Sequence, residues 1–564
     1  MKSINVFNLG ALLVSSVTPL AISCPTAHHA APIVDLSNGT YRGTYNQHYH
    51  QDLFLGMPYA KAPVNDLRLC VPQSLNSTWT GIRNATKYSP SCIGYGSDTW
   101  VLGNHVSEDC LSINVVRPAG LPEGAKLPVA VWIHGGGWVN GGSSDPRYNL
   151  SFIVEQSVRN GMPIIAASMN YRLHAWGFLH SAELAAEGST NLGYRDQRLA
   201  LHWIKENIAN FGGDSERVTL WGESAGAFSV GSQLVAYGGR DDKLFSAAIL
   251  QSGSPLVFGL KPQTASTWEP YWNKLLHTTN CSVAEPVACL RKIPTNELSA
   301  VLNSSFASPP SWGQVVDGDF IPASGRALLK KGKFAKVPLL TGTNFDEGTE
   351  FVSQGINTTS QFAQYVRSVG VAKPAVHSIE KLYSNNPAVG IPGTLKGRPE
   401  GHLTYLGRQY KRAAAFSGDV FQHAGRRLTA QSWAKQQIPV WSYHWNVLVK
   451  NVSPAKGASH FQEVVFTFNN ANGQGYDTVV SNNPLAGKPA SLVKLADVMS
   501  TAWISFIVNH NPNSYGKTQS LTWPQYRERS EKNLVFDVNV TGLAYSEPDS
   551  FRHKQIAYII DNLY

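Results

Sequence analysis

The sequence predicts an α/β fold in which a mostly parallel central sheet carries helices on both faces. Apolar runs of strand length occur at residues 126–133, 163–172 and 218–221. Between the second and third runs, residues 192–211 place apolar side chains at helix spacing and end at two glycines. Strands that alternate with helices through short turns are typical of a parallel sheet.

The composition is that of an ordinary globular protein, with 43% hydrophobic and 15% charged residues in a chain of 564. The net charge is +9, from 47 basic and 38 acidic residues. These charges are scattered, and the densest basic groups are pairs such as Lys330-Lys331 and Arg426-Arg427. Without a basic stripe, no nucleic-acid partner is expected. No cofactor or metal is expected either.

The first residues are typical of a secretory leader. Lys2 supplies the positive start, residues 9–22 form an apolar stretch, and Ala21 and Ser23 are small residues suited to cleavage. The stretch is short and is interrupted by serine and proline, unlike a membrane span. We therefore predict a signal peptide over residues 1–23 and one large catalytic domain over residues 24–564.

Glycosylation signals also indicate export. Nine N-x-[ST] triplets follow the leader, at Asn38, Asn76, Asn84, Asn149, Asn280, Asn303, Asn357, Asn451 and Asn539. Residues 556–564 lack a long apolar tail, so neither a membrane anchor nor a lipid-anchor signal is expected. The prediction is a secreted, extracellular glycoprotein, with its oligomeric state left open.

Four of the six cysteines form two local pairs. Cys92 and Cys110 flank a loop rich in Gly, Ser and Asp, and Cys281 and Cys289 enclose a shorter one. In an oxidising compartment each pair favours a disulfide, and the first would contribute about 3 kcal/mol through loop entropy.

Two cysteines remain, Cys24 and Cys70. Either they pair with each other, or Cys24 is lost with the leader and Cys70 stays a buried free thiol. Sequence alone leaves both arrangements open.

The stretch from Val218 to Ala227 predicts a strand, a sharp turn and a helix of small residues. Its turn, Gly222-Glu223-Ser224-Ala225-Gly226, fits the G-x-S-x-G nucleophile elbow. The glycines are needed because a Cβ at either position would collide with neighbouring chain. Ser224 would then present its hydroxyl above the sheet, beside the positive end of the following helix.

A second glycine-rich turn follows the strand at residues 126–133. His134 is succeeded by three glycines and Trp138. Backbone amides in such a loop are free to point at a ligand, as in the HGGG-type loops that help to build an oxyanion hole.

A serine hydroxyl needs a base, and the base needs an acid to orient it. In this architecture the order along the chain is Ser, Asp/Glu, His. Glu347 follows a predicted strand at residues 337–343, and His460 lies in a loop after the predicted last core strand, residues 438–445. Asp346 offers the same chemistry as Glu347. His444 is a rival base, but its position inside a strand favours a packed residue.

Taken together, these motifs resemble the type-B carboxylesterases, the family of cholinesterases and fungal esterase/lipases. The matching stretches are residues 108–115 (EDCLSINV), 134–138 (HGGGW), 170–172 (NYR), 196–201 (DQRLAL), 207–214 (NIANFGGD), 222–226 (GESAG), 346–348 (DEG) and 459–460 (SH). The resemblance implies an α/β-hydrolase fold with helical insertions.

The resemblance also assigns roles to individual residues. It implies a catalytic triad of Ser224, Glu347 and His460, and oxyanion donors at the amides of Gly136, Gly137 and Ala225. It supports the Cys92–Cys110 and Cys281–Cys289 bridges, and buried structural ion pairs of Arg172 with Asp196 and of Arg68 with Glu108. The chain departs from the family at two positions. Cys70 stands where an ordinary core or polar residue is more usual, and Trp138 stands where phenylalanine is commoner.

The implied function is two-step hydrolysis of carboxylic esters through an acyl-enzyme. Small or short-chain soluble esters are expected, because the 17 residues between Cys92 and Cys110 leave little room for the helical lid of fungal lipases. The alternatives are a triglyceride lipase of the same family and an inactive adhesion-type binding protein, against which the complete triad argues.

Three residues are expected to line the substrate gorge: Trp100, Trp138 and Glu223. Trp100 lies where cholinesterases place a choline-binding tryptophan, so that cation–π binding is one interpretation. A tryptophan that only covers the gorge wall is the other.

Overall fold

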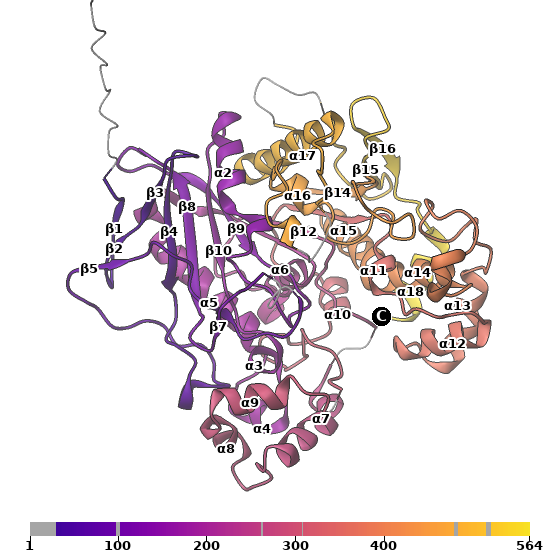
Figure 1. The fold of residues 1–564 in the computed structure, drawn as a ribbon, viewed down its shortest axis with the longest axis horizontal. Coiled ribbons are helices and arrows are strands. Elements are labelled where there is room, and N and C mark those ends of the chain that lie inside the picture. Colours follow the sequence, from indigo (N-terminus) through magenta and orange to yellow (C-terminus); the bar gives the residue numbers. More distant parts are fainter. Residues whose placement is uncertain (1–29, 98–101, 261–262, 307, 479–482, 515–520) are drawn as a thin grey trace, which may run out of the picture.

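The computed structural model describes residues 30–97, 102–260, 263–306, 308–478, 483–514 and 521–564 (Figure 1). The predicted signal peptide, Cys24 and Trp100 lie outside these residues. The signal peptide and the single domain therefore stay predictions.

An 11-stranded sheet forms the centre of the described chain. Its strands, in spatial order, are β16 (Ala544–Pro548), β15 (Lys532–Phe536), β14 (Val440–Trp445), β13 (Leu339–Asn344), β12 (Ala247–Gln251), β11 (Gly213–Glu223), β9 (Leu127–Ile133), β10 (Ile165–Met169), β8 (Ser112–Pro118), β4 (Gln51–Pro58) and β3 (Thr44–Asn46). Neighbours from β10 to β15 are parallel, and the pairs at both edges are antiparallel. The predicted, mostly parallel α/β sheet is confirmed.

One prediction about the sheet is wrong. Residues 438–445 were expected to form the last core strand, but β14 is followed by β15 and β16. β15 (KNLVF) contains only three consecutive apolar residues, and the side chains of β16 are largely exposed. Short or exposed strands lack the continuous apolar run by which a buried strand is found in a sequence.

Successive side chains along a strand point to opposite faces of the sheet, and in these strands both sets are apolar. Helices therefore cover both faces. Val129, Val131 and Ile133 of β9 face a core shared with α5 (Leu192–Asn207), α6 (Ala225–Val235) and α15 (Ala424–Lys435). On the opposite face, Ala130 and Trp132 pack with α2 (Leu150–Arg159), α16 (Val464–Thr467) and α17 (Ala490–Asn509).

The helix α17 is long and apolar enough to cross a membrane by length and composition alone. Most of it is buried against the sheet, with side chains such as Trp503 and Phe506 fully enclosed. Its burial identifies α17 as a core helix of the protein.

Two helical lobes flank the sheet (Figure 1). One holds α7 (Ala265–Thr278), α8 (Pro286–Lys292) and α9 (Thr295–Leu302) around its own apolar cluster. The other holds α12 (Thr359–Ser368), α13 (Lys373–Leu382), α14 (Tyr410–Gly418) and α18 (His553–Asn562). Helical insertions are expected from the sequence, and α18, close to the C-terminus, packs with the second lobe.

The expected covalent and ionic links are present. Disulfides join Cys92 to Cys110 and Cys281 to Cys289, and Cys70 is a free, half-buried thiol. The ion pairs Arg68–Glu108 (2.7 Å) and Arg172–Asp196 (2.6 Å) are both buried, as predicted.

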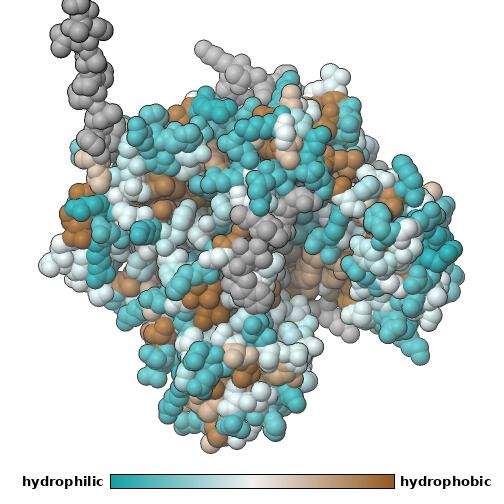
Figure 2. Space-filling model, in the orientation of Figure 1, coloured by the Kyte–Doolittle hydropathy of each residue, from teal (hydrophilic) through white to brown (hydrophobic). Residues whose placement is uncertain are grey.

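The molecular face in Figure 2 is mostly hydrophilic, and its hydrophobic side chains occur in small separate groups. Seven of the nine glycosylation triplets present an exposed asparagine. The exceptions are Asn38 and Asn149, which are partly buried. Asn38 Nδ2 donates to two backbone carbonyls, of Leu75 and Ser77, and its amide is thus already engaged.

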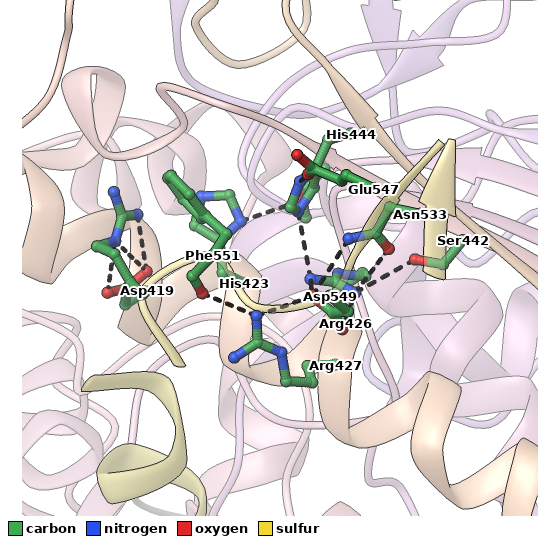
Figure 3. A network of polar contacts seen from close by, with 12 residues as sticks. Asp419, His423, Arg426, Arg427, Ser442, His444, Asn533, Glu547, Asp549 and Phe551 are labelled. Carbon is green, nitrogen blue, oxygen red and sulfur yellow. Dashed lines mark hydrogen bonds and ion pairs between the residues drawn. The ribbon is translucent and has the colours of Figure 1, made fainter. Parts of the chain in front are cut away.

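The C-terminal segment is held to the sheet by a buried ionic network (Figure 3). Asp549 accepts hydrogen bonds from Arg426 (2.7 and 2.9 Å) and from Arg427 (2.8 Å), and Arg426 is fully enclosed. Burial alone would raise the pKa of Asp549, but the two guanidinium groups hold that pKa well below its usual value. The carboxylate is therefore ionised and balances a buried positive charge.

We predict that Asp549→Asn lowers the free energy of unfolding by about 3–5 kcal/mol, because it leaves buried arginines without their counter-charge. Urea unfolding measures the change. The matched control is Asp319→Asn, whose carboxylate pairs with Arg195 at 2.7 Å but is 65% exposed. The control substitution should lower the free energy of unfolding by less than about 1 kcal/mol. Equal effects of the two substitutions would contradict the assignment.

Candidate active site

The parallel strands bring four loops to one edge of the sheet. Each of β9, β11, β13 and β14 ends at this edge, and the paired registers Gly222↔Ile133 and Asn344↔Trp445 align the strand ends. The loops that follow carry His134 to Trp138, Ser224, Glu347 and His460. Ligand sites in open α/β sheets lie at this carboxyl edge.

Ser224 occupies a strained turn between β11 and α6. Its φ and ψ are 54° and −128°, a conformation that side-chain-bearing residues rarely adopt. A Cβ on Gly226 would lie 2.0 Å from the carbonyl oxygen of Ile133, and one on Gly222 would lie 2.5 Å from the backbone of Gly226. The two glycines therefore permit the sharp turn that the G-x-S-x-G pattern predicts.

His460 contacts Glu347 directly. Its Nδ1 lies 2.7 Å from Glu347 Oε2. The other carboxylate oxygen accepts hydrogen bonds from the backbone amide of Asn344 (2.8 Å) and from the hydroxyl of Ser252. Glu347 is completely buried, so its orientation is set by these three donors.

The rival acid and base have other partners. Asp346 Oδ2 accepts the backbone amide of Ala458 at 2.9 Å and so supports the loop that carries His460. His444 is buried in β14, where its ring nitrogens contact Arg426 (3.2 Å) and Glu547 (3.1 Å). Both contacts belong to the C-terminal network (Figure 3).

The second nitrogen of His460 faces another carboxyl group. His460 Nε2 lies 3.3 Å from Glu223 Oε1 and has no hydrogen-bond partner among the described residues. It borders the cavity that Ser224 also lines. An imidazole that is held at Nδ1 by a carboxylate and makes no hydrogen bond at Nε2 can accept a proton from a hydroxyl.

Buried carboxyl groups control the charge of this imidazole. Burial alone would lower the pKa of His460, but the negative charges of Glu223 and Glu347 outweigh burial and raise it. Burial raises the pKa of Glu223 well above its usual value. The protonation of Glu223 and that of His460 are therefore coupled, because a negative charge on Glu223 favours the imidazolium.

Glycine-rich backbone faces the same cavity. Gly136 and Gly137 have positive φ, 95° and 63°, and both line the cavity together with Ala225. A Cβ on Gly136 would lie 2.2 Å from the carbonyl oxygen of Asn140, which explains the glycine there. Trp138 is largely buried and also borders the cavity.

The cavity has a volume of about 820 Å³. It brings together Ser224, His460 and all three expected amide donors, along with Glu223 and Trp138 of the predicted gorge. Trp100, the third gorge residue, lies outside the described residues.

Sequence reasoning missed three polar residues beneath the triad. Ser252 and Asn344 bind Glu347, and Glu463 accepts hydrogen bonds from Asn344 Nδ2 (2.7 Å) and Gln251 Nε2 (3.0 Å). A signal for Ser252 and Asn344 was their position at the ends of β12 and β13. Glu463 gave no local signal beyond its place three residues after His460.

Comparison with known proteins agrees with this geometry. Residues 30–556 match the model of the carboxylesterase family. Lipase 2 of Geotrichum candidum is 33% identical over 86% of this chain and 88% of its own length. A secreted triacylglycerol lipase of Gibberella zeae is 30% identical over 96% of this chain and 93% of its own.

Among solved structures, EstA of Aspergillus niger superposes with a TM-score of 0.79, at 28% identity, over 94% of this chain and 98% of that one. The α/β-hydrolase fold implied by the sequence is thereby confirmed. The chain belongs to the carboxylesterase family and is an ester hydrolase.

Proposed function

We propose that the chain is a secreted serine hydrolase that cleaves carboxylic esters with Ser224 as nucleophile, His460 as base and Glu347 as the orienting acid. The observation that carries this proposal is the 2.7 Å contact between His460 Nδ1 and Glu347 Oε2. This contact leaves His460 Nε2 free to face the cavity lined by Ser224.

The reaction proceeds in two steps. His460 Nε2 takes the proton of Ser224 Oγ as that oxygen attacks the acyl carbon. The oxyanion is stabilised by the amides of Gly136, Gly137 and Ala225, each worth roughly 3 kcal/mol of barrier. His460 then protonates the leaving alcohol, and a water activated in the same way releases the acid.

Secretion is part of the proposal. It is supported by the leader-like N-terminus, the two disulfides and the secreted lipase of Gibberella zeae among the relatives.

The ester class is the finer part of the proposal. The sequence favoured short soluble esters over acylglycerols, but the relatives reported above are named lipases and support acylglycerols. We therefore propose acylglycerol hydrolysis. Short soluble esters remain the second candidate, on the evidence of the short Cys92–Cys110 segment and of EstA.

Ser224→Ala should reduce kcat by at least about four orders of magnitude, since the nucleophile is lost. Its circular dichroism and melting temperature should match those of the wild type. In the wild-type protein an organophosphate should form an adduct on Ser224, detected by peptide mass. An unlabelled Ser224 in a folded protein would favour the adhesion-type alternative.

The pH profile tests the role of His460. The base works only when it is unprotonated, so its raised pKa places the acidic limb of kcat/KM above pH 6.5. In Glu223→Gln this limb should move to lower pH by about one unit, because a neighbouring negative charge is removed. A limb that stays in place would show that Glu223 does not act on His460.

Substrate length separates the two ester classes. An acylglycerol lipase should hydrolyse emulsified long-chain triacylglycerol, with its rate rising above the solubility limit of the substrate. Titration of the released acid measures that rate. Activity confined to dissolved short-chain esters would instead establish the second candidate.

A further inference from the structure

The active-site cavity has two walls of different chemistry. The aromatic wall consists of Trp138, Phe228, Phe258 and Phe351, all of which line the cavity. Their rings form a continuous series, with centroid distances of 5.8, 5.7 and 5.4 Å between successive members. Phe351 ends the series 4.8 Å from the ring of His460. An apolar chain fits this wall.

The second, more polar wall consists of Arg147, Phe461, Gln462 and Tyr476, which line the same cavity. The Arg147 guanidinium lies 4.8 Å from the centre of the Phe461 ring, and that ring lies 6.3 Å from the ring of Tyr476. Arg147 is paired with Asp145 at 2.6 Å, so its charge is already balanced.

Packing holds the polar wall in place. Asn470 Nδ2 donates to the carbonyl of Gln474 (2.9 Å) and also to that of Arg147 (3.3 Å). These bonds attach the turn before Tyr476 to the turn that carries Arg147. Tyr476 itself is only 2% exposed, so its side chain is enclosed by protein.

Two polar atoms of this wall lack partners. The hydroxyl of Tyr476 and Oε1 of Gln462 are buried and make no hydrogen bond to any described residue. Leaving such groups unpaired is costly. A tyrosine hydroxyl can donate or accept and an amide oxygen accepts, so a ligand with free hydroxyl groups can satisfy both. An apolar chain would leave both unpaired.

The chain positions of the walls indicate which part of the ester each receives. Trp138 directly follows Gly137, and Phe228 lies one helical turn after Ala225, so the aromatic wall adjoins the proposed oxyanion donors. Gln462 lies two residues after His460, whose Nε2 protonates the leaving oxygen. Both walls reach His460, but only the aromatic wall also adjoins the amide donors, so the acyl chain is placed against the aromatic wall and the alcohol against the polar wall.

We propose that Tyr476 and Gln462 bind free hydroxyl groups of the leaving alcohol. Esters of polyols that retain free hydroxyls, such as partial acylglycerols, are then hydrolysed in preference to the same acyl chain on a simple alcohol. This inference rests on the proposed function and narrows its substrate class.

The test compares glyceryl monobutyrate with propyl butyrate, which share an acyl group and differ by two hydroxyls. In Tyr476→Phe, kcat/KM for the glyceryl ester should fall roughly three- to tenfold, mainly through KM, because one hydrogen bond is lost. The value for propyl butyrate should stay the same. Gln462→Met should act in the same direction.

Tyr365→Phe is the matched control, since Tyr365 is a buried tyrosine on α12 that does not line the cavity. It should leave the ratio of the two kcat/KM values unchanged. The inference is overturned if Tyr476→Phe lowers kcat/KM equally for both esters, which would indicate a structural role. It is also overturned if the substitution changes kcat/KM for neither ester. Wild-type protein that cleaves emulsified triacylglycerol but neither butyrate ester would overturn this inference alone, whereas protein that cleaves none of the three substrates would overturn the proposed function.

Discussion

The close contact between Gly226 and the end of β9 is the constraint on which the rest of the site depends. The N-terminus of α6 lies so near the carbonyl of Ile133 that no side chain fits between them. This contact places the Ser224 turn beside the loop that continues from β9 into His134 and Gly136. Ser224 and the proposed amide donors are thus positioned by one packing interaction between the backbones of a helix and a strand, which support a site more precisely than loops do.

Burial of several ionisable groups around one imidazole is the second main feature. Glu223, Glu347 and Glu463 are all nearly inaccessible to solvent, and such carboxyl groups are costly unless they are paired or neutral. Glu347 has three hydrogen-bond donors, one of which is the ring of His460. Burial raises the pKa of Glu463 and Glu223. Carboxyl groups of one chemical type therefore have different environments in this site, as is common in acid–base enzymes.

The two walls of the cavity give this family member a physical basis for substrate choice. The groups proposed to act on the ester bond itself are backbone amides and buried polar side chains. One wall is a series of aromatic rings in tilted and edge-to-face contact, and the other carries unpaired polar atoms. Specificity based on unpaired polar atoms can be strong, because a ligand that lacks the matching group leaves them unsatisfied.

The sequence by itself determined the local geometry of this protein. A strand, a glycine, a serine and a second glycine predict the elbow, and three glycines after a strand predict the amide loop, because backbone conformation follows from neighbouring residues. Short cysteine spacings likewise predicted both disulfides. Only the tertiary structure decided that Glu347 rather than Asp346 contacts His460, that His444 belongs to another network, and that Ser252 and Glu463 lie beneath the triad. These choices join residues as many as 212 positions apart. Strand register and side-chain direction, which bring such residues together, are not encoded by any local pattern.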